Sequence, residues 1–179
     1  MRIIAGSRRG HKLFDFDGTD IRPTTDRVRE SMFNLIMPFI PDARVLDLFG
    51  GSGALSLDDL SRGAESAVIC DSDVHSVGLI KKNISALRFE SETAVIPMTA
   101  QRFISEANGG FDIVFLDPPY NKGLIAPIIT GLLENGVLSQ NGIIVLESDN
   151  TDEHGEFDGL EILKQRKYGR TFITVYRKL

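Results

Sequence analysis

The chain has 179 residues, of which 42% are hydrophobic and 25% charged, and its formal net charge at pH 7 is -5. This length allows one domain with a substantial core, and the composition is ordinary for a globular protein. The single cysteine, Cys70, excludes an intramolecular disulfide and a cysteine-rich zinc site. His11, His75 and His154 lie far apart and lack the spacing of metal ligands, so we expect no metal.

No segment of the sequence resembles a targeting or membrane-spanning element. Arg8-Arg9 is similar to the pair in a twin-arginine signal, but no apolar run of useful length follows it. The longest apolar-rich stretch, 124–133, is too short to cross a bilayer. We therefore expect a cytoplasmic protein that has no membrane partner.

The first 40 residues are predicted to form an arm and a helix that pack on the main part of the chain. Segments 2–6 and 12–16 are expected to pair as short strands. Residues 23–37 predict a helix with Thr24 or Thr25 as N-cap and Asp26 in its first turn. Its expected apolar stripe comprises Val28, Met32, Leu35 and Ile36, with Arg27 and Glu30 outside it. We interpret residues 1–179 as one domain, in which 1–40 are the arm and helix and 41–179 the core.

From residue 44 onward, short apolar runs alternate with helical patterns. Strands are predicted at 44–49, 66–71, 93–97, 112–117 and 142–147, and helices near 54–62, 74–87, 100–107 and 124–135. This alternation predicts right-handed crossovers and a parallel, doubly wound α/β sheet. Segments 160–165 and 171–177, with a turn near Tyr168-Gly169, predict an antiparallel hairpin instead. The expected fold is thus Rossmann-like, with a mostly parallel seven-stranded sheet and an antiparallel C-terminal hairpin.

Basic residues gather at both ends of this expected fold. Residues 1–12 and 164–179 contain no acid, and they hold Arg2, Arg8, Arg9, Lys12, Lys164, Arg166, Lys167, Arg170, Arg177 and Lys178. If the two ends meet in space, they form a positive face on an acidic body, which suits a nucleic acid. On charge alone, two solvated ends are an equally good interpretation.

A glycine-rich loop, DLFGGSGALSL, follows the first predicted strand and begins at Asp47. Glycine permits positive φ and close approach of a ligand to the backbone. The dinucleotide pattern begun at Gly51 meets Ser56 where it needs glycine, and the nucleophile-elbow pattern begun at Gly50 meets Ala54. No P-loop lysine follows any of these glycines. A ligand-binding loop of another kind and a purely structural turn both remain open.

Acids also follow two later strands. Asp71 ends the second predicted strand, where an acid can bind a ribose diol, although a helix-capping role is the alternative. Asp73 could instead cap the helix that begins near Val74. After the fourth predicted strand the sequence reads Asp117-Pro118-Pro119-Tyr120. A proline-rich strand end explains the two prolines but not the carboxylate and the aromatic ring on either side of them.

Together these residues resemble the class I S-adenosylmethionine-dependent methyltransferases. In that class the pattern [D/N]-P-P-[Y/F/W] marks enzymes that methylate exocyclic amino nitrogens of DNA, RNA or protein glutamine. Five segments are similar in order and spacing to the bacterial 16S ribosomal RNA (guanine-N2) methyltransferase family: RIIAG…RG…L (2–13), IRPTTDRVRESMFN (21–34), DLFGGSGAL (47–55), LSRGA (60–64) and LDPPY (116–120). The resemblance covers nearly the whole chain. Phe49 departs from the general class, in which the first of three alternating glycines is common at that point.

The resemblance implies a set of residues for the cofactor S-adenosylmethionine. The loop would run beside its methionine part, Asp71 would bind the ribose hydroxyls, and Asp47 would orient the loop or meet the amino group through water. Thr99 or backbone groups would contact the adenine, because this chain lacks the acid that related enzymes often have there. The full expected set is Asp47, Phe49, Gly50, Gly51, Ser52, Gly53, Asp71, Thr99, Ala100 and Asp117.

The resemblance also implies a catalytic corner and an RNA-binding face. Asp117 and the carbonyl of Pro118 would accept the N–H groups of guanine N2, Pro119 would fix that carbonyl, and Tyr120 would stack on the base. The expected phosphate contacts are Arg8, Arg9, Lys12, Arg22, Arg27, Arg29 and Arg170. The expected partner is ribosomal RNA or a partly assembled small ribosomal subunit, bound by a monomer that needs no metal.

Two other functions remain open at this point. The same corner would serve an amino-methyltransferase that acts on adenine N6 or on protein glutamine. A nucleic-acid-binding or assembly module that has lost catalysis is the second, and the intact Asp117 and Asp71 count against it. A nicotinamide dehydrogenase is a more distant third, because Ser56 breaks its fingerprint.

Overall fold

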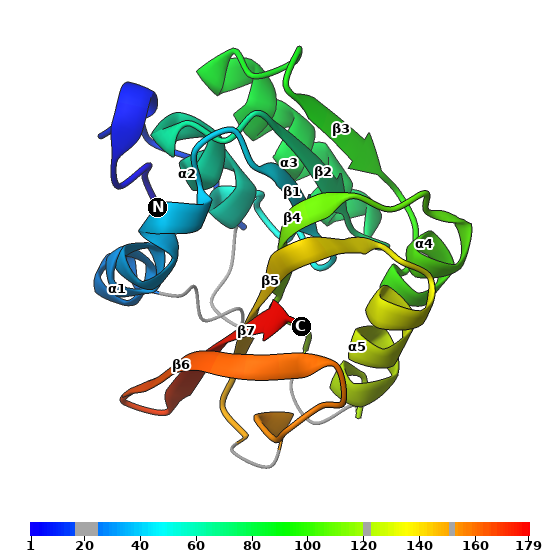
Figure 1. Ribbon diagram of the computed structural model, residues 1–179. Coiled ribbons are helices and arrows are strands. Elements are labelled where there is room, and N and C mark those ends of the chain that lie inside the picture. Colours follow the sequence, from blue (N-terminus) through cyan, green and yellow to red (C-terminus); the bar gives the residue numbers. More distant parts are fainter. Residues whose placement is uncertain (17–24, 120–122, 151–152) are drawn as a thin grey trace.

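The computed structural model describes residues 1–16, 25–119, 123–150 and 153–179. Its centre is a seven-stranded sheet in the order β3-β2-β1-β4-β5-β7-β6 (Figure 1). The strands are β1 Arg44–Asp47, β2 Ser66–Cys70, β3 Thr93–Ile96, β4 Phe111–Leu116, β5 Leu138–Ser148, β6 Leu160–Tyr168 and β7 Thr171–Lys178. β1 to β5 pair in parallel, whereas β7 lies antiparallel between β5 and β6. The predicted Rossmann-like sheet with an antiparallel C-terminal hairpin is confirmed.

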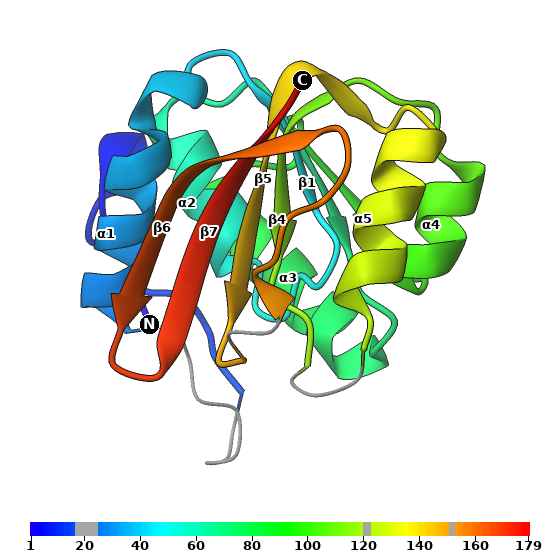
Figure 2. The same cartoon turned by 60° about the horizontal axis from the view of Figure 1, so that its bottom comes forward.

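Helices cover both faces of the sheet (Figure 2). The helices α1 Asp26–Ile36, α2 Ala54–Arg62 and α3 Val74–Leu87 pack on one face, and α4 Ala100–Glu106 and α5 Ile125–Glu134 on the other. Two short 3-10 turns, η1 Gly6–Arg8 and η2 Met37–Phe39, flank α1 in the sequence. No helix in the described part of the chain combines the length and hydropathy that a bilayer crossing requires.

Local chemistry explains where the helices begin. Thr25, the second of the two candidate caps, accepts a hydrogen bond at Oγ1 from the Val28 N–H (3.4 Å). The Asp73 carboxylate accepts one from the Ser76 N–H (2.8 Å) and so caps α3 as expected. Phe33 of α1 meets Phe115 of β4 edge-on, with ring centroids 6.1 Å apart, which fixes α1 on the sheet.

Several element boundaries differ from the prediction, three of them with a structural reason. β5 begins at Leu138 rather than at 142, because the pairing of β4 with β5 shifts register between Phe111 and Ile113. β6 continues to Tyr168, and the hairpin turns at residues 169–170, where Gly169 has φ 63°. The predicted strand at 160–165 is confirmed, but the run of charged side chains after it concealed its extension to 168, which is tolerated because β6 lies at the edge of the sheet. In the arm, an isolated antiparallel bridge between Arg2 and Lys12 replaces the expected pair of strands.

The arm is held against α2, the helix that follows the glycine loop. The Ile4 N–H donates to Asp58 Oδ1 (2.9 Å), and the Arg8 N–H donates to Ser61 Oγ (2.9 Å). Gly6 has φ 80°, and a Cβ there would lie 1.7 Å from the Ser61 carbonyl oxygen. Only glycine therefore allows the arm to approach α2 this closely.

Arg29 is buried beneath the arm, with 1% of its surface exposed. Its Nη2 donates to the Arg2 carbonyl oxygen and pairs with Asp26 Oδ1 (3.3 Å), and its Nε lies 3.7 Å from Asp58 Oδ2. Burial lowers the pKa of Arg29, against the opposing effect of Asp58 and Asp26. The expectation that Arg29 contacts RNA phosphate is wrong, because its guanidinium is enclosed and already bound to protein groups.

Candidate active site

Asp47, the last residue of β1, lies beneath the glycine loop with 1% of its surface exposed. Its Oδ1 accepts from the Phe49 N–H and its Oδ2 from Ser56 Oγ, each at 3.3 Å. Burial raises the pKa of Asp47 to about 7, although both hydrogen bonds oppose that shift. Asp47 therefore orients the loop from the interior.

The backbone of the loop needs its glycines. The Gly50 N–H donates to the Cys70 carbonyl oxygen of β2 (2.9 Å), and a Cβ on Gly50 would lie 2.5 Å from Ile69 Cγ2. Gly51 and Gly53 have φ angles of 56° and 80°. Gly53 is the N-cap of α2, and it offers no side chain to bind the first N–H groups of that helix. The loop is thus a tight turn whose backbone conformation requires these glycines.

Asp71 fastens the crest of this loop to the start of α3. Its Oδ2 accepts from the Gly51 N–H and its Oδ1 from the Asp73 N–H, both at 2.9 Å. Since Asp73 is the cap of α3, Asp71 is free of that role. A carboxylate has about four acceptor sites, so each half-buried oxygen retains one for a further donor, such as a ribose hydroxyl.

The segment after β3 completes this edge of the sheet. Thr99 caps α4 by accepting from the Arg102 N–H (3.3 Å), and Ala100 is the buried first residue of that helix. The Thr99 hydroxyl keeps its own O–H donor, so both its side chain and its backbone remain available to a ligand. The loop, Asp71 and residues 98–100 follow neighbouring parallel strands, and ligands bind at the carboxyl ends of such strands.

Asp117 follows β4 directly beside this edge. β4 pairs with β1, and the Leu48 N–H donates to the Phe115 carbonyl oxygen (3.4 Å). Side chains alternate along strands, so Asp117 shares the face of Phe115 and of its register partner Asp47. Pro118 is buried and Pro119 exposed. Tyr120 lies outside the described residues.

Glu147, near the end of β5, is a neighbour of Asp117 that was absent from the predicted site. Leu116 pairs with Leu146 in the parallel β4–β5 ladder. Asp117 and Glu147 each come one residue later, so they lie side by side on the same face of the sheet. Burial raises the pKa of Asp117 well above its usual range, and the charges of Glu147 and Asp47 raise it further. The sequence carried a signal for Glu147, because the apolar run IIVLE ends in an acid, as do the runs that end in Asp47 and Asp117. The described part of the chain contains no group of three or more His, Cys, Asp or Glu placed to hold a metal ion.

The predicted RNA contacts divide into residues that bind protein groups and exposed cations. Besides Arg29, Arg8 is used structurally, because its Nε donates to the Leu87 carbonyl oxygen (2.9 Å) and its guanidinium lies 5.0 Å from the Phe89 ring centroid. The exposed members of the predicted set are Arg9, Lys12, Arg27 and Arg170, while Arg22 lies outside the described residues.

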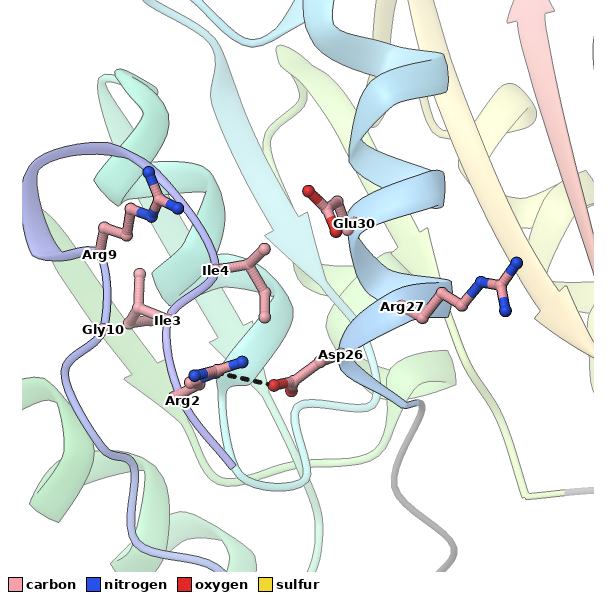
Figure 3. Close-up of a pocket in the computed structure, with 8 residues that line it drawn as sticks. All are labelled: Arg2, Ile3, Ile4, Arg9, Gly10, Asp26, Arg27 and Glu30. Carbon is pink, nitrogen blue, oxygen red and sulfur yellow. Dashed lines mark hydrogen bonds and ion pairs between the residues drawn. The ribbon is translucent and has the colours of Figure 1, made fainter.

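A cavity of about 260 Å³ separates the arm from α1 (Figure 3). Its lining includes Arg2, Arg9, Arg27, Asp26 and Glu30. Arg2 Nε pairs with Asp26 Oδ2 (2.9 Å), whereas Arg27 extends from α1 away from the arm. α1 in turn contacts β7, so the two basic ends of the chain lie on one side of the molecule (Figure 2).

Comparisons with known proteins agree with this geometry. The family model described as "Conserved hypothetical protein 95" matches residues 1–177. The ribosomal RNA small subunit methyltransferase D of Escherichia coli (strain K12) is 41% identical over 149 residues, which cover 83% of this chain and 75% of that protein. The protein of the same name from Haemophilus influenzae is 36% identical and covers 99% of this chain and 93% of its own length.

A solved structure of the Escherichia coli protein yhhF superposes with a TM-score of 0.90 at 36% identity, and the match covers 99% of this chain and 97% of that one. A conserved hypothetical protein of Streptococcus pyogenes superposes with a TM-score of 0.79 at 37% identity, over 85% and 96% of the two chains. The family match, the fold and the close relatives agree on the family of this chain. This chain belongs to the ribosomal RNA methyltransferase family whose model is described as "Conserved hypothetical protein 95".

Proposed function

We propose that the protein transfers a methyl group from S-adenosylmethionine to the exocyclic N2 amine of a guanine in small-subunit ribosomal RNA. The observation that carries this proposal is the adjacency of Asp117 to the glycine loop at the ends of β4 and β1. Two close relatives are named small subunit ribosomal RNA methyltransferases, which supports the substrate class.

The residues at the loop fit the cofactor. Gly50 and Gly53 are buried, and a Cβ on Gly50 would clash with Ile69, so the close turn before α2 requires glycine there and leaves room for a ligand beside half-buried Gly51. The Asp71 carboxylate faces the same edge and keeps acceptor capacity for the ribose hydroxyls. When bound, the cofactor supplies an electrophilic methyl group on a sulfonium sulfur, so the protein has to supply the placement of the nucleophile.

Guanine N2 is a poor nucleophile because its lone pair is delocalised into the ring. Asp117 and the Pro118 carbonyl oxygen accept its two N–H groups and hold the lone pair toward the methyl group. Pro119 restricts Pro118 to extended conformations and lacks an N–H that would compete for the amine. Such orientation is worth on the order of 7–11 kcal/mol of barrier reduction, so it outweighs acid–base chemistry here.

The proton that leaves the amine after methylation passes to the Asp117 carboxylate. Burial and the Glu147 charge raise the pKa of Asp117, which makes its ionised form a stronger acceptor of hydrogen bonds and protons. Tyr120, by this proposal, stacks on the target base, a contact worth about 1–3 kcal/mol.

RNA phosphates lie along the basic side of the molecule. The exposed Arg9 and Lys12 of the arm, Arg27 of α1 and Arg170 of the hairpin provide this contact, and Arg22 joins them by its resemblance to the family segment. The cavity between the arm and α1, which Arg2 and Arg9 line, belongs to this basic side of the molecule. These contacts position the RNA without reading its sequence. We further propose that the protein acts as a monomer in the cytoplasm, where ribosomal subunits assemble.

The test is methyl transfer to ribosomal RNA and small subunits that lack the modification, followed by nucleoside mass spectrometry. Asp117→Asn is expected to lower turnover by about 10²–10³-fold, as for the loss of one preorganised polar contact, with little change in cofactor affinity. Asp112→Asn is the matched control, because Asp112 is a carboxylate at the opposite end of the same strand, bound to the Arg44 N–H (2.9 Å). Wild-type turnover in Asp117→Asn, or methyl groups found on adenine alone, would reject the proposal.

A further inference from the structure

One fully buried amide joins the arm to the glycine loop. Asn83 lies on α3 with 0% of its surface exposed. Its Oδ1 accepts from the Phe14 N–H (2.7 Å), and its Nδ2 donates to the carbonyl oxygens of Phe14 (3.0 Å) and Ser52 (2.9 Å). A single side chain thus binds both backbone groups of one arm residue and one carbonyl of the loop.

A second contact joins the same two segments. Ser52 Oγ donates to the sulfur of Met1 (3.6 Å), and the Leu13 N–H donates to the Met1 carbonyl oxygen (3.0 Å). The arm is therefore joined to Ser52 directly through Met1 and indirectly through Asn83, and Ser52 is itself buried with 8% of its surface exposed. Position 14 and position 52 cannot shift independently without breaking buried hydrogen bonds, and an unsatisfied buried polar group is costly.

We propose that Asn83 is a positioning residue that couples occupancy of the glycine loop to the placement of the arm at Phe14. The inference rests on the proposed function insofar as the loop is taken as the cofactor site. A ligand that stabilises the loop conformation also stabilises the Ser52–Asn83–Phe14 connection. Coupling of this kind is reciprocal, so whatever holds the arm, including bound RNA, tightens the loop toward the cofactor.

The Phe14 N–H donates directly to Asn83, so its hydrogen exchange reports on the connection. Exchange is measured by mass spectrometry on the full chain, with and without S-adenosylhomocysteine. In the wild-type protein the ligand is expected to slow exchange at residues 13–16 by about tenfold, equivalent to one net hydrogen bond. In Asn83→Leu and Asn83→Asp this slowing is expected to disappear, and the affinity for S-adenosylhomocysteine to fall by about tenfold.

Asn83→Asp keeps the acceptor for the Phe14 N–H but sets a carboxylate oxygen against two carbonyl oxygens, so the exchange of the wild-type protein decides the coupling if neither variant folds. Asn135→Asp is the matched control, because Asn135 Nδ2 also donates to a backbone carbonyl, that of Gly131 (3.0 Å), at the end of α5 on the other face of the sheet. Asn135→Asp is expected to keep the wild-type affinity for S-adenosylhomocysteine and the wild-type slowing of exchange at residues 13–16.

The outcomes separate this inference from the proposed function. Ligand binding without any change in exchange at residues 13–16 of the wild-type protein would overturn the coupling and leave the proposed function intact. Folded Asn83 variants that retain both the affinity and the slowing would overturn it as well. Failure of the wild-type protein to bind S-adenosylhomocysteine, measured by calorimetry, would overturn both.

Discussion

The arm and the C-terminal hairpin are both basic in sequence, yet they use their charges differently. In the arm and the helix beside it, Arg8 and Arg29 donate to carbonyl oxygens of the protein, and Arg29 also pairs with buried Asp58. In the hairpin, Lys164 and Arg170 are exposed. Arg8 and Arg29 thus serve docking, whereas Lys164 and Arg170 stay at the surface, as do Arg9 and Lys12 of the arm.

The difference follows from what each region packs against. The arm buries Ile3 and Leu13 but otherwise lies over α2, whose Asp58 and Asp59 have 0% of their surface exposed, so hydrogen bonds and ion pairs also hold it in place. The hairpin extends an existing sheet, where backbone pairing with β5 supplies that stability. A basic cluster in a sequence therefore does not indicate nucleic-acid contact by itself, because its side chains can instead hold one segment of the protein against another.

The contrast between the two regions predicts its largest effect on stability at Arg29. Arg29→Met should lower the free energy of unfolding by about 3 kcal/mol, the low end for a broken buried ion pair, because buried Asp58 then keeps Arg62 as its cation but loses Arg29. Urea denaturation measures the change. Arg27→Met, two residues earlier on the exposed side of α1, should change stability by no more than about 0.5 kcal/mol. Equal losses in the two variants would show that the arm is not anchored through Arg29.

The acids beneath the loop and arm predict a pH dependence that hairpin charges do not share. Burial raises the pKa of Asp47 to about 7 and that of Asp59 well above its usual range, the latter against the opposing charge of Arg62. The folded state therefore binds more protons than the unfolded state above pH 4, and stability falls as the pH rises toward 8. Asp47 alone should contribute a loss of about 2–3 kcal/mol between pH 5 and 8.

Chemical denaturation across this pH range checks the expectation. Asp59→Asn should flatten the slope, because neither carboxyl oxygen of Asp59 has a hydrogen-bond partner among the described residues, and the amide carries no charge to bury. Lys167→Gln in the hairpin should leave the slope as in wild type. If the dependence of stability on pH is the same in Asp59→Asn as in wild type, then Asp59 is not one of the groups that titrate.

The smallest effect on stability is expected in the hairpin, where the proposed contact with RNA predicts an effect on binding. Lys164→Gln combined with Arg170→Gln should change the free energy of unfolding by no more than about 0.5 kcal/mol. The slope of log affinity against log salt for ribosomal RNA should fall by about one unit for each phosphate that the variant no longer neutralises. Filter binding over a salt series measures it, and an unchanged slope would remove the hairpin from the RNA face.

Much of this structure was predictable because its signals are local. Apolar runs marked the strands, and Thr25 and Asp73 marked helix starts that the structure bears out. The acids Asp47, Asp71 and Asp117 could be placed at one edge because parallel strands bring their carboxyl ends together. These inferences needed only spacing and the direction of the chain.

The errors lie where distant segments meet. The burial of Arg29 depends on Asp58 and on the backbone of the arm, none of which is near it in sequence. Asn83 looks like an ordinary polar residue of a helix until Phe14 and Ser52 are brought to it. The start of β5 moved because of an irregular register with β4, a property of the pair and not of either strand.

The position of β7 has a consequence for how the chain is made. Although β7 comes last of the strands, it lies between β5 and β6, so the edge of β5 stays unpaired until residues 171–178 have been synthesised. An unpaired apolar edge invites association with other chains while translation continues. We expect nascent chains that stop before residue 171 to depend on chaperones and to aggregate without them.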